Sequence, residues 1–245
     1  MRSLAFVLIA SALTLSAQTI LGAGPNIYSR AKEASLGAQL AQNVSQATTP
    51  LDNAAALSYV QQMGAKLAAQ LPESSFPYTF ALIADSKNAG GSGDALEEPL
   101  AIPGGYVFVP ARMFLTAQDD SEFAGLLAHA MAHVAERHGT RAASMNTLGA
   151  MAGTPVKANP ASPMLIPASY VNFSGSFEQE ADGLALKMVA TAGYDPQGLI
   201  RYVSRERLNN AERIAAMQNA IQGLPHPATA EFLQIQMQLR NLPRN

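Results

Sequence analysis

The 245-residue chain has no cysteine and no tryptophan, and it has only four histidines. Without cysteine it can form no disulfide framework, thiolate zinc site, iron–sulfur cluster or thiol nucleophile. Charged residues make up 14% of the sequence, against roughly 25% in an average soluble domain. Because 16 Lys and Arg are balanced by 18 Asp and Glu, the composition excludes a broad basic surface, and we expect no nucleic-acid partner.

The first 22 residues have the layout of a secretory signal peptide. Met1-Arg2 gives a positive start, and Leu4 to Ala17 is an uncharged apolar run with Gly22 following. The run is shorter than the roughly 20 residues that a membrane span needs. We therefore expect a periplasmic or secreted protein, with residues 1–22 as signal peptide and residues 23–245 as a single domain. The alternative is an N-terminal anchor that is not cleaved.

The spacing of apolar residues indicates a mainly helical α+β fold. It predicts helices over residues 28–44, 51–71, 119–138, 177–192, 196–221 and 228–239. Residues 78–83 and 106–109 alternate as strands do, and we expect them to form a hairpin with a long glycine-rich connection. The stretch 142–177 holds a single charge, Lys157. We interpret it as a long loop, either a mobile lid or an ordinary surface loop.

Two histidines on the predicted helix 119–138 carry the strongest chemical signal. His129 and His133 are four residues apart, so both imidazoles project from one face and can bind one tetrahedral metal. Their neighbours are small and apolar, and would solvate an unligated pair poorly. The alternative is two unrelated histidines on a boundary face. His138 lies about 140° round the helix from His133, and we expect it to interact with the helix end instead.

A third ligand is available at the start of the predicted helix 177–192. Glu178 and Asp182 are again four residues apart. A carboxylate oxygen of Glu178 suits zinc, and Asp182 could accept the second N–H of a ligand histidine. The alternative is an acidic first turn that the helix dipole favours. We expect Glu180 to point away into solvent.

Together with further motifs, these residues resemble metallopeptidase family 48, the gluzincins that include HtpX, Ste24-type CAAX proteases and BepA-like proteases. The matching motifs are Pro103 to Val109, Leu127 to Thr140, Glu178 to Asp182, Ala192 to Pro196 and His226-Pro227. The resemblance implies a zincin-like metallopeptidase domain in which a small β-sheet edges the active-site cleft. It also implies one zinc ion bound by His129, His133 and Glu178, with Asp182 behind them.

The same resemblance assigns two further roles. His226 occupies the place of a histidine that can cover the open position of the zinc. The strand of Tyr106, Val107, Phe108 and Val109 should border the cleft and pair with an extended substrate backbone. The implied substrate or client is a polypeptide, with envelope membrane proteins among the candidate partners.

One departure from the family motif bears on activity. The motif is His-Glu-x-x-His, whose glutamate is the general base that activates the attacking water. This chain has Ala130 at that position, and losing a positioned base costs on the order of 10²–10⁴-fold in rate. Glu136 is the nearest carboxylate in sequence, but it lies two helical turns from His129.

Three hypotheses follow. The first is a zinc metalloendopeptidase of the cell envelope whose activity is reduced or absent because of Ala130. The second is a non-catalytic zinc-binding relative that binds polypeptide as a chaperone or quality-control adaptor. The third is that Ala130 is an introduced substitution that inactivates a peptidase.

Overall fold

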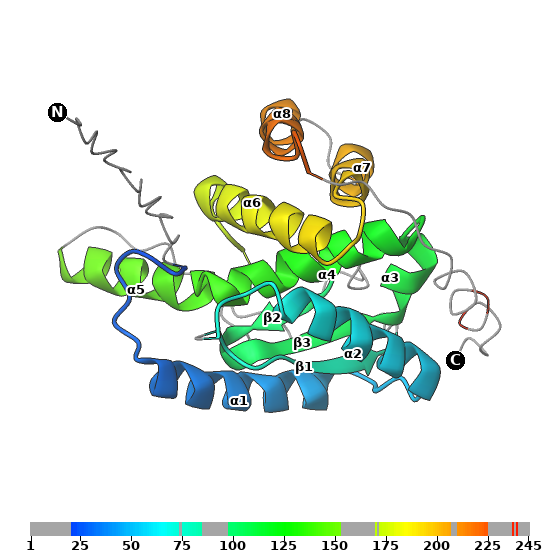
Figure 1. Cartoon of the computed structure of the whole chain (residues 1–245). Coiled ribbons are helices and arrows are strands. Elements are labelled where there is room, and N and C mark those ends of the chain that lie inside the picture. Colours follow the sequence, from blue (N-terminus) through cyan, green and yellow to red (C-terminus); the bar gives the residue numbers. More distant parts are fainter. Residues whose placement is uncertain are drawn as a thin grey trace, which may run out of the picture.

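The computed structural model describes residues 21–73, 75–84, 98–152, 170, 172–206, 210–224, 237 and 239. The elements, in chain order, are α1 (Arg30–Ala47), α2 (Ala54–Ala68), β1 (Thr79–Ile83), β2 (Leu100–Ile102), η1 (Pro103–Gly105), β3 (Tyr106–Pro110), α3 (Ala111–Thr116), α4 (Asp120–Ala135), α5 (His138–Met151), α6 (Gly175–Thr191), α7 (Gln197–Glu206) and α8 (Ala211–Ala220). Helices dominate and the sheet is small (Figure 1). The expected mainly helical α+β class is confirmed.

The sheet has the strand order β1-β3-β2. β3 pairs with β1 in parallel and with β2 antiparallel. The predicted hairpin between residues 78–83 and 106–109 is therefore wrong. The tight turn η1 joins β2 to β3 instead, because Gly104 and Gly105 adopt φ values of 83° and 96°, a region that side chains disfavour.

The two faces of the sheet are covered by different helices (Figure 1). Along β3, Val107 and Val109 belong to the core that contains α4, whereas Phe108 packs with residues of α1. This alternation follows from the two-residue period of a strand. α6 and α7 pack on the side of α4 that faces away from the sheet, and α8 packs on α6 and α7. α4 is thus the central helix of the fold.

α4 begins at a side-chain cap. The Asp119 carboxylate accepts a hydrogen bond from the Glu122 backbone N–H at 2.8 Å, which is one half of a capping box. The Glu122 carboxylate does not complete that box but binds the Arg205 guanidinium, at 2.5 and 3.2 Å. Every residue of α4 except His129 is buried. A helix buried all round belongs at the centre of a core.

Two of the predicted helices are each divided. The predicted helix 119–138 ends at Ala135, because Arg137 adopts a left-handed conformation with φ of 57°. α5 then covers residues 138–151, so the first part of the predicted loop 142–177 is helical. The predicted helix 196–221 is likewise two helices, α7 and α8.

Several predictions concern residues outside the described part of the chain. They are the leader except for residues 21 and 22, the stretch 153–169, His226, and the helix 228–239 except for residues 237 and 239. Among the described helices, none combines the length and the hydropathy of a membrane span.

Candidate metal centre

The packing of α6 against α4 brings four predicted residues together. His129 and His133 project from α4, and Glu178 and Asp182 project from the first turns of α6. His129 is the one residue of α4 that is only partly buried. Its side chain therefore lies at the border between the core and the site. Two pairs with four-residue spacing, one on each helix, therefore face each other, as their periodicity allows.

Three of these side chains present their donor atoms to a common point. His129 Nε2 lies 3.1 Å from His133 Nε2 and 3.5 Å from Glu178 Oε2, and His133 Nε2 lies 3.8 Å from Glu178 Oε1. Zinc–nitrogen bonds of 2.0–2.1 Å in a tetrahedron separate neighbouring ligand atoms by about 3.3 Å. The donor set and its spacing therefore fit a tetrahedral zinc ion that has a fourth position open.

The surroundings of His129 favour a positive charge. Burial acts to lower the pKa of His129, but hydrogen bonds to Asp182 and Glu178 outweigh burial and raise that pKa to about 9. Two imidazole nitrogens 3.1 Å apart also need a hydrogen or a metal ion between them, because their lone pairs repel each other. A zinc ion would satisfy both nitrogens and the Glu178 carboxylate together.

A carboxylate and an arginine lie behind His129. Asp182 Oδ1 lies 3.0 Å from His129 Nδ1, and Arg213 of α8 binds both oxygens of Asp182, at 2.6 and 2.8 Å. Arg213 Nη1 also lies 3.1 Å from Glu178 Oε2. Burial acts to raise the pKa of Asp182, but the bonds from His129 and Arg213 outweigh it and lower that pKa. Asp182 is therefore an ionised carboxylate that lies against Nδ1 of the His129 ring.

Arg213 did not figure among the predicted site residues. It lies 31 residues from Asp182, and no motif marks it. The available signal is weaker: Arg213 is an arginine in α8, the second helix after the acidic start of α6, and carboxylates withdrawn from water need a counter-charge.

A different set of residues lies behind His133. Its Nδ1 lies 2.9 Å from His138 Nδ1, and its ring stacks on Phe173 with centroids 4.0 Å apart. His138 Nε2 in turn lies 3.1 Å from Glu180 Oε2. Glu180 is exposed, as expected, but it is not only solvated, because it also accepts a hydrogen bond from Arg141 at 2.7 Å. His138 is at the start of α5, not at the end of the preceding helix as expected.

Comparison with known proteins identifies the family of the chain. The sequence profile of peptidase family M48 matches residues 54–234, a span that includes both helices of the site. The chain belongs to peptidase family M48. The family 48 resemblance seen in the motifs is thus confirmed, and the chain is by family a peptidase.

Individual M48 relatives are also similar over this region. The "Putative beta-barrel assembly-enhancing protease" of Vibrio cholerae is 31% identical over 163 residues, which are 60% of this chain and 32% of that protein. The "Beta-barrel assembly-enhancing protease" of Escherichia coli K12 is 26% identical over 178 residues, which are 64% of this chain and 34% of that protein. The chain therefore spans about a third of the length of the curated relatives it matches.

Ala130 follows His129 directly on α4 and is 6% exposed. Its methyl group can hold no proton, so it adds no acid or base to the M48 site. Glu136 does not compensate. Its carboxylate lies in the turn between α4 and α5 and accepts a hydrogen bond from the Gly22 backbone N–H at 2.7 Å. Burial in that turn raises the pKa of Glu136.

The predicted substrate-edge strand is misplaced. Tyr106, Val107 and Phe108 pair with β1 on one side and with β2 on the other, so their backbone groups are already used and cannot bind a substrate. Val109 pairs with β1 and is fully buried. Within the described residues, the strand that leaves one edge unpaired next to α4 is β2, Leu100–Ile102. Sequence alone did not reveal this short strand because the glycine-rich stretch precedes it.

Proposed function

We propose that this chain binds one zinc ion through His129, His133 and Glu178, and that its cleft acts on polypeptides as a metalloendopeptidase site. The spacing of the three donor groups, 3.1–3.8 Å, carries the proposal, because it is close to the edge of a tetrahedral zinc site. Membership of peptidase family M48 supports the choice of reaction.

The side chains around the site have distinct tasks in this proposal. Zinc bound there would polarise a peptide carbonyl and activate water. Asp182 keeps Nδ1 of His129 protonated, so that Nε2 is free to bind metal. Arg213 places one positive charge between Asp182 and Glu178 and orients Glu178. Ala130 supplies no proton acceptor, so we propose that hydrolysis is reduced or absent in the chain as written.

A polypeptide is the proposed substrate because of the adjacent sheet edge. β2 runs antiparallel to β3 and packs against α4. An extended segment could add to the edge of β2 that no described strand pairs, by backbone hydrogen bonds that are available on any peptide whatever its sequence. The names of the relatives, which are proteases that enhance β-barrel assembly, favour a protein substrate of the cell envelope.

Ala130 favours a second function for the same cleft. A site that keeps its metal ligands but has no general base can bind polypeptide without cutting it. We therefore also propose a non-catalytic chaperone or quality-control adaptor. The leader-like residues 1–22 support a periplasmic or secreted location for either function.

Measuring zinc content and proteolysis together separates the two functions. We would compare the chain with Ala130→Glu and with Ala130→Gln, which matches the glutamate in shape but cannot act as a base. Each protein is loaded with zinc, its stoichiometry is measured, and cleavage of an unfolded protein is followed. We expect one zinc per chain in all three, and cleavage about 10²–10⁴-fold faster in Ala130→Glu only.

The outcomes are distinct. Zinc binding with equally slow cleavage in all three proteins would favour the adaptor and reject the peptidase. Equal acceleration by Ala130→Glu and Ala130→Gln would reject the proposed general-base position. Failure to bind zinc, or unchanged zinc binding in Glu178→Gln, would reject the metal site. If His226 covers the zinc, His226→Ala in the Ala130→Glu background should raise the rate.

A further inference from the structure

His133 is held between the proposed zinc position and a second imidazole. Its Nε2 faces His129 and Glu178, while its Nδ1 lies 2.9 Å from Nδ1 of His138. A neutral imidazole has one donor nitrogen and one acceptor nitrogen. If Nε2 of His133 binds metal, its Nδ1 must carry the proton and donate it to His138.

This requirement determines the tautomer of His138 in turn. Its Nδ1 must accept, so its Nε2 carries the proton and donates to Glu180 Oε2, 3.1 Å away. Glu180 can act as the acceptor, because its Oε2 also accepts a hydrogen bond from the Arg141 guanidinium at 2.7 Å. The contacts therefore form a chain with one direction, from His133 through His138 to the Glu180–Arg141 pair.

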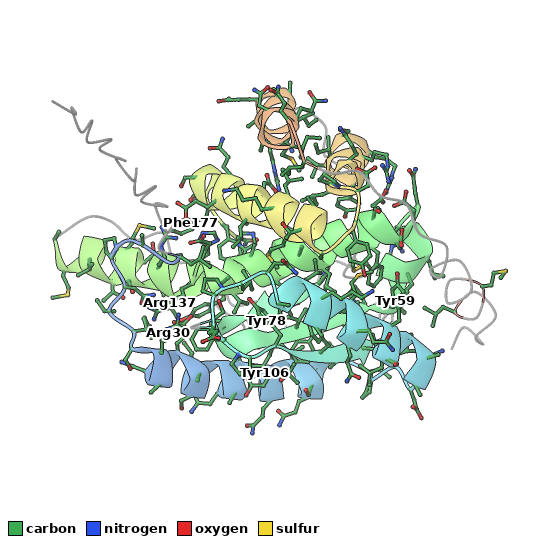
Figure 2. The ribbon with its side chains drawn as sticks, in the orientation of Figure 1. Arg30, Tyr59, Tyr78, Tyr106, Arg137 and Phe177 are labelled. Carbon is green, nitrogen blue, oxygen red and sulfur yellow. The ribbon has the colours of Figure 1, made fainter. Side chains whose placement is uncertain are left out.

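The packing around His138 keeps this geometry rigid. The ring is fully buried and stacks on Phe177 at a centroid distance of 4.4 Å and an interplanar angle of 14°. Phe177 lies in the first turn of α6, near the junction of α4 and α5 (Figure 2). The Arg141 guanidinium lies 4.6 Å from the Phe177 ring centre. Buried rings that stack in this way have little freedom to turn.

A metal ion is a poorer explanation of the same side chains. Glu136, His138 and Glu180 are close enough to form a second metal cluster. However, Arg141 already donates to Glu180 Oε2 and the Gly22 N–H donates to Glu136 Oε2. A cation would have to displace both donors and accept the repulsion of the guanidinium. These contacts make the cluster an organised support for His133.

The two histidines of the proposed zinc site thus have matching supports. Behind His129 stand Asp182 and Arg213. Behind His133, the ring of His138 comes first, and the carboxylate of Glu180 and the guanidinium of Arg141 follow it. α6 supplies both carboxylates, and the second one lies at the surface, with its side chain 42% exposed.

We propose that His138 is a positioning residue which fixes the ring and tautomer of His133 for metal binding, and that Glu180 fixes His138. The inference rests on the proposed zinc site. It predicts that removing His138 weakens zinc binding even though His138 does not touch the metal. Residues behind metal ligands typically contribute 10–100-fold in affinity.

Zinc affinity, measured by competition with a chromophoric chelator, tests each link. His138→Phe keeps an aromatic ring to stack on Phe177 but removes both nitrogens, and we expect affinity to fall about 10–100-fold. Glu180→Met removes the acceptor and should lower affinity by a smaller factor of about 10. Glu180→Gln keeps an acceptor oxygen and should recover most of that loss. Glu212→Gln, an acid-to-amide change at an exposed position of α8, is the control and should leave affinity unchanged.

A second readout does not depend on the variants' stability. Long-range ¹H–¹⁵N NMR of the zinc-loaded chain should show His138 as the Nε2–H tautomer and His133 protonated at Nδ1. An Nδ1–H tautomer of His138, or His138→Phe and Glu180→Met affinities within about 2-fold of the parent, would overturn the inference while leaving the zinc site intact. A parent chain that binds no zinc would overturn both the zinc site and this inference.

Discussion

The Arg213 guanidinium donates two parallel hydrogen bonds to the Asp182 carboxylate, from Nε to Oδ2 at 2.6 Å and from Nη2 to Oδ1 at 2.8 Å. The same guanidinium reaches Glu178 at 3.1 Å. Such a planar two-point contact fixes the carboxylate in direction as well as charge. Through Asp182 it also fixes His129, so a residue of α8 determines the shape of a site built on α4 and α6.

Replacing Arg213 should weaken both the fold and the metal site. Arg213→Met leaves the buried Asp182 carboxylate without its main counter-charge, and we expect a loss of about 3 kcal/mol in the unfolding free energy of the metal-free chain. Zinc affinity should fall about 10-fold or more. Urea denaturation and chelator competition measure the two effects.

A matched control is available on α7. Arg201 also pairs with an aspartate, Asp119, but both side chains are more than a third exposed. Exposed pairs contribute about 0–1 kcal/mol, so Arg201→Met should have little effect on stability and none on zinc affinity. Equal losses in the two variants would contradict the role of Arg213.

How far the sequence predicts this site depends on the range of the contacts involved. The sequence predicted the four residues His129, His133, Glu178 and Asp182 because each pair lies on one helix. Within a helix, a four-residue spacing fixes the relative direction of the side chains. Arg213, Glu180 and Phe173 act across helices. Their positions depend on how the helices pack, which no local spacing encodes.

The fold shows the same limit. The predicted helices 28–44, 51–71 and 177–192 have ends close to those of α1, α2 and α6, since caps and periodicity are local signals. The break at Arg137 was missed because it is stabilised from far along the chain: Arg137 Nε binds Glu33 and its Nη2 binds the Tyr28 carbonyl, both at 2.7 Å. The antiparallel pairing predicted for the segment 78–83 was also wrong. The strand β2, which lies between β1 and the tight turn along the chain, is too short to carry a recognisable pattern.

The contact between Arg137 and Glu33 should be measurable in stability. Glu33 is almost fully buried, and burial raises its pKa even beside Arg137. Arg137→Ala leaves the Glu33 carboxylate buried without its counter-charge, and the residue at position 137 must still adopt a left-handed conformation. We therefore expect the unfolding free energy to fall by about 3–5 kcal/mol. Arg137→Gly removes the conformational cost and should be about 1 kcal/mol more stable than Arg137→Ala.

A double variant checks the electrostatic part of that loss. Adding Glu33→Gln to Arg137→Gly removes the stranded charge and should recover part of the stability, as thermal and urea unfolding would show. If Arg137→Ala and Arg137→Gly were equally stable, the left-handed conformation would not explain the break between α4 and α5.

Gly37 should tolerate no side chain, although it lies within α1. A Cβ there would lie 1.8 Å from the carbonyl oxygen of Pro103, a backbone atom of the turn that joins β2 to β3. Gly37→Ala should therefore lower the unfolding free energy by about 1–3 kcal/mol, despite the roughly 1 kcal/mol that alanine gains in a helix.

Gly183→Ala in α6 is the matched control, because nothing lies within 4 Å of its Cβ. We expect that control to raise the unfolding free energy by about 0.5–1 kcal/mol; a loss as large as that of Gly37→Ala would refute the assigned contact.

The metal-free chain should lose stability as pH rises, because of His129. Its pKa is raised to about 9, above the ordinary value near 6.5, so its proton stabilises the fold fully below pH 6.5. That contribution disappears as pH rises through 9, and we expect a decline of about 2–3 kcal/mol in unfolding free energy. His138 works against this decline only at the low end of the range, because burial lowers its folded pKa to about 4, whereas the unfolded imidazole is still partly protonated at pH 6, so its contribution rises slightly up to about pH 7.5. Urea denaturation in the presence of a chelator, at pH 6 and at pH 9.5, measures the decline.

The control variant His129→Gln has no such proton and should show a much smaller decline with pH. An unchanged decline in that variant would assign the titration to another group.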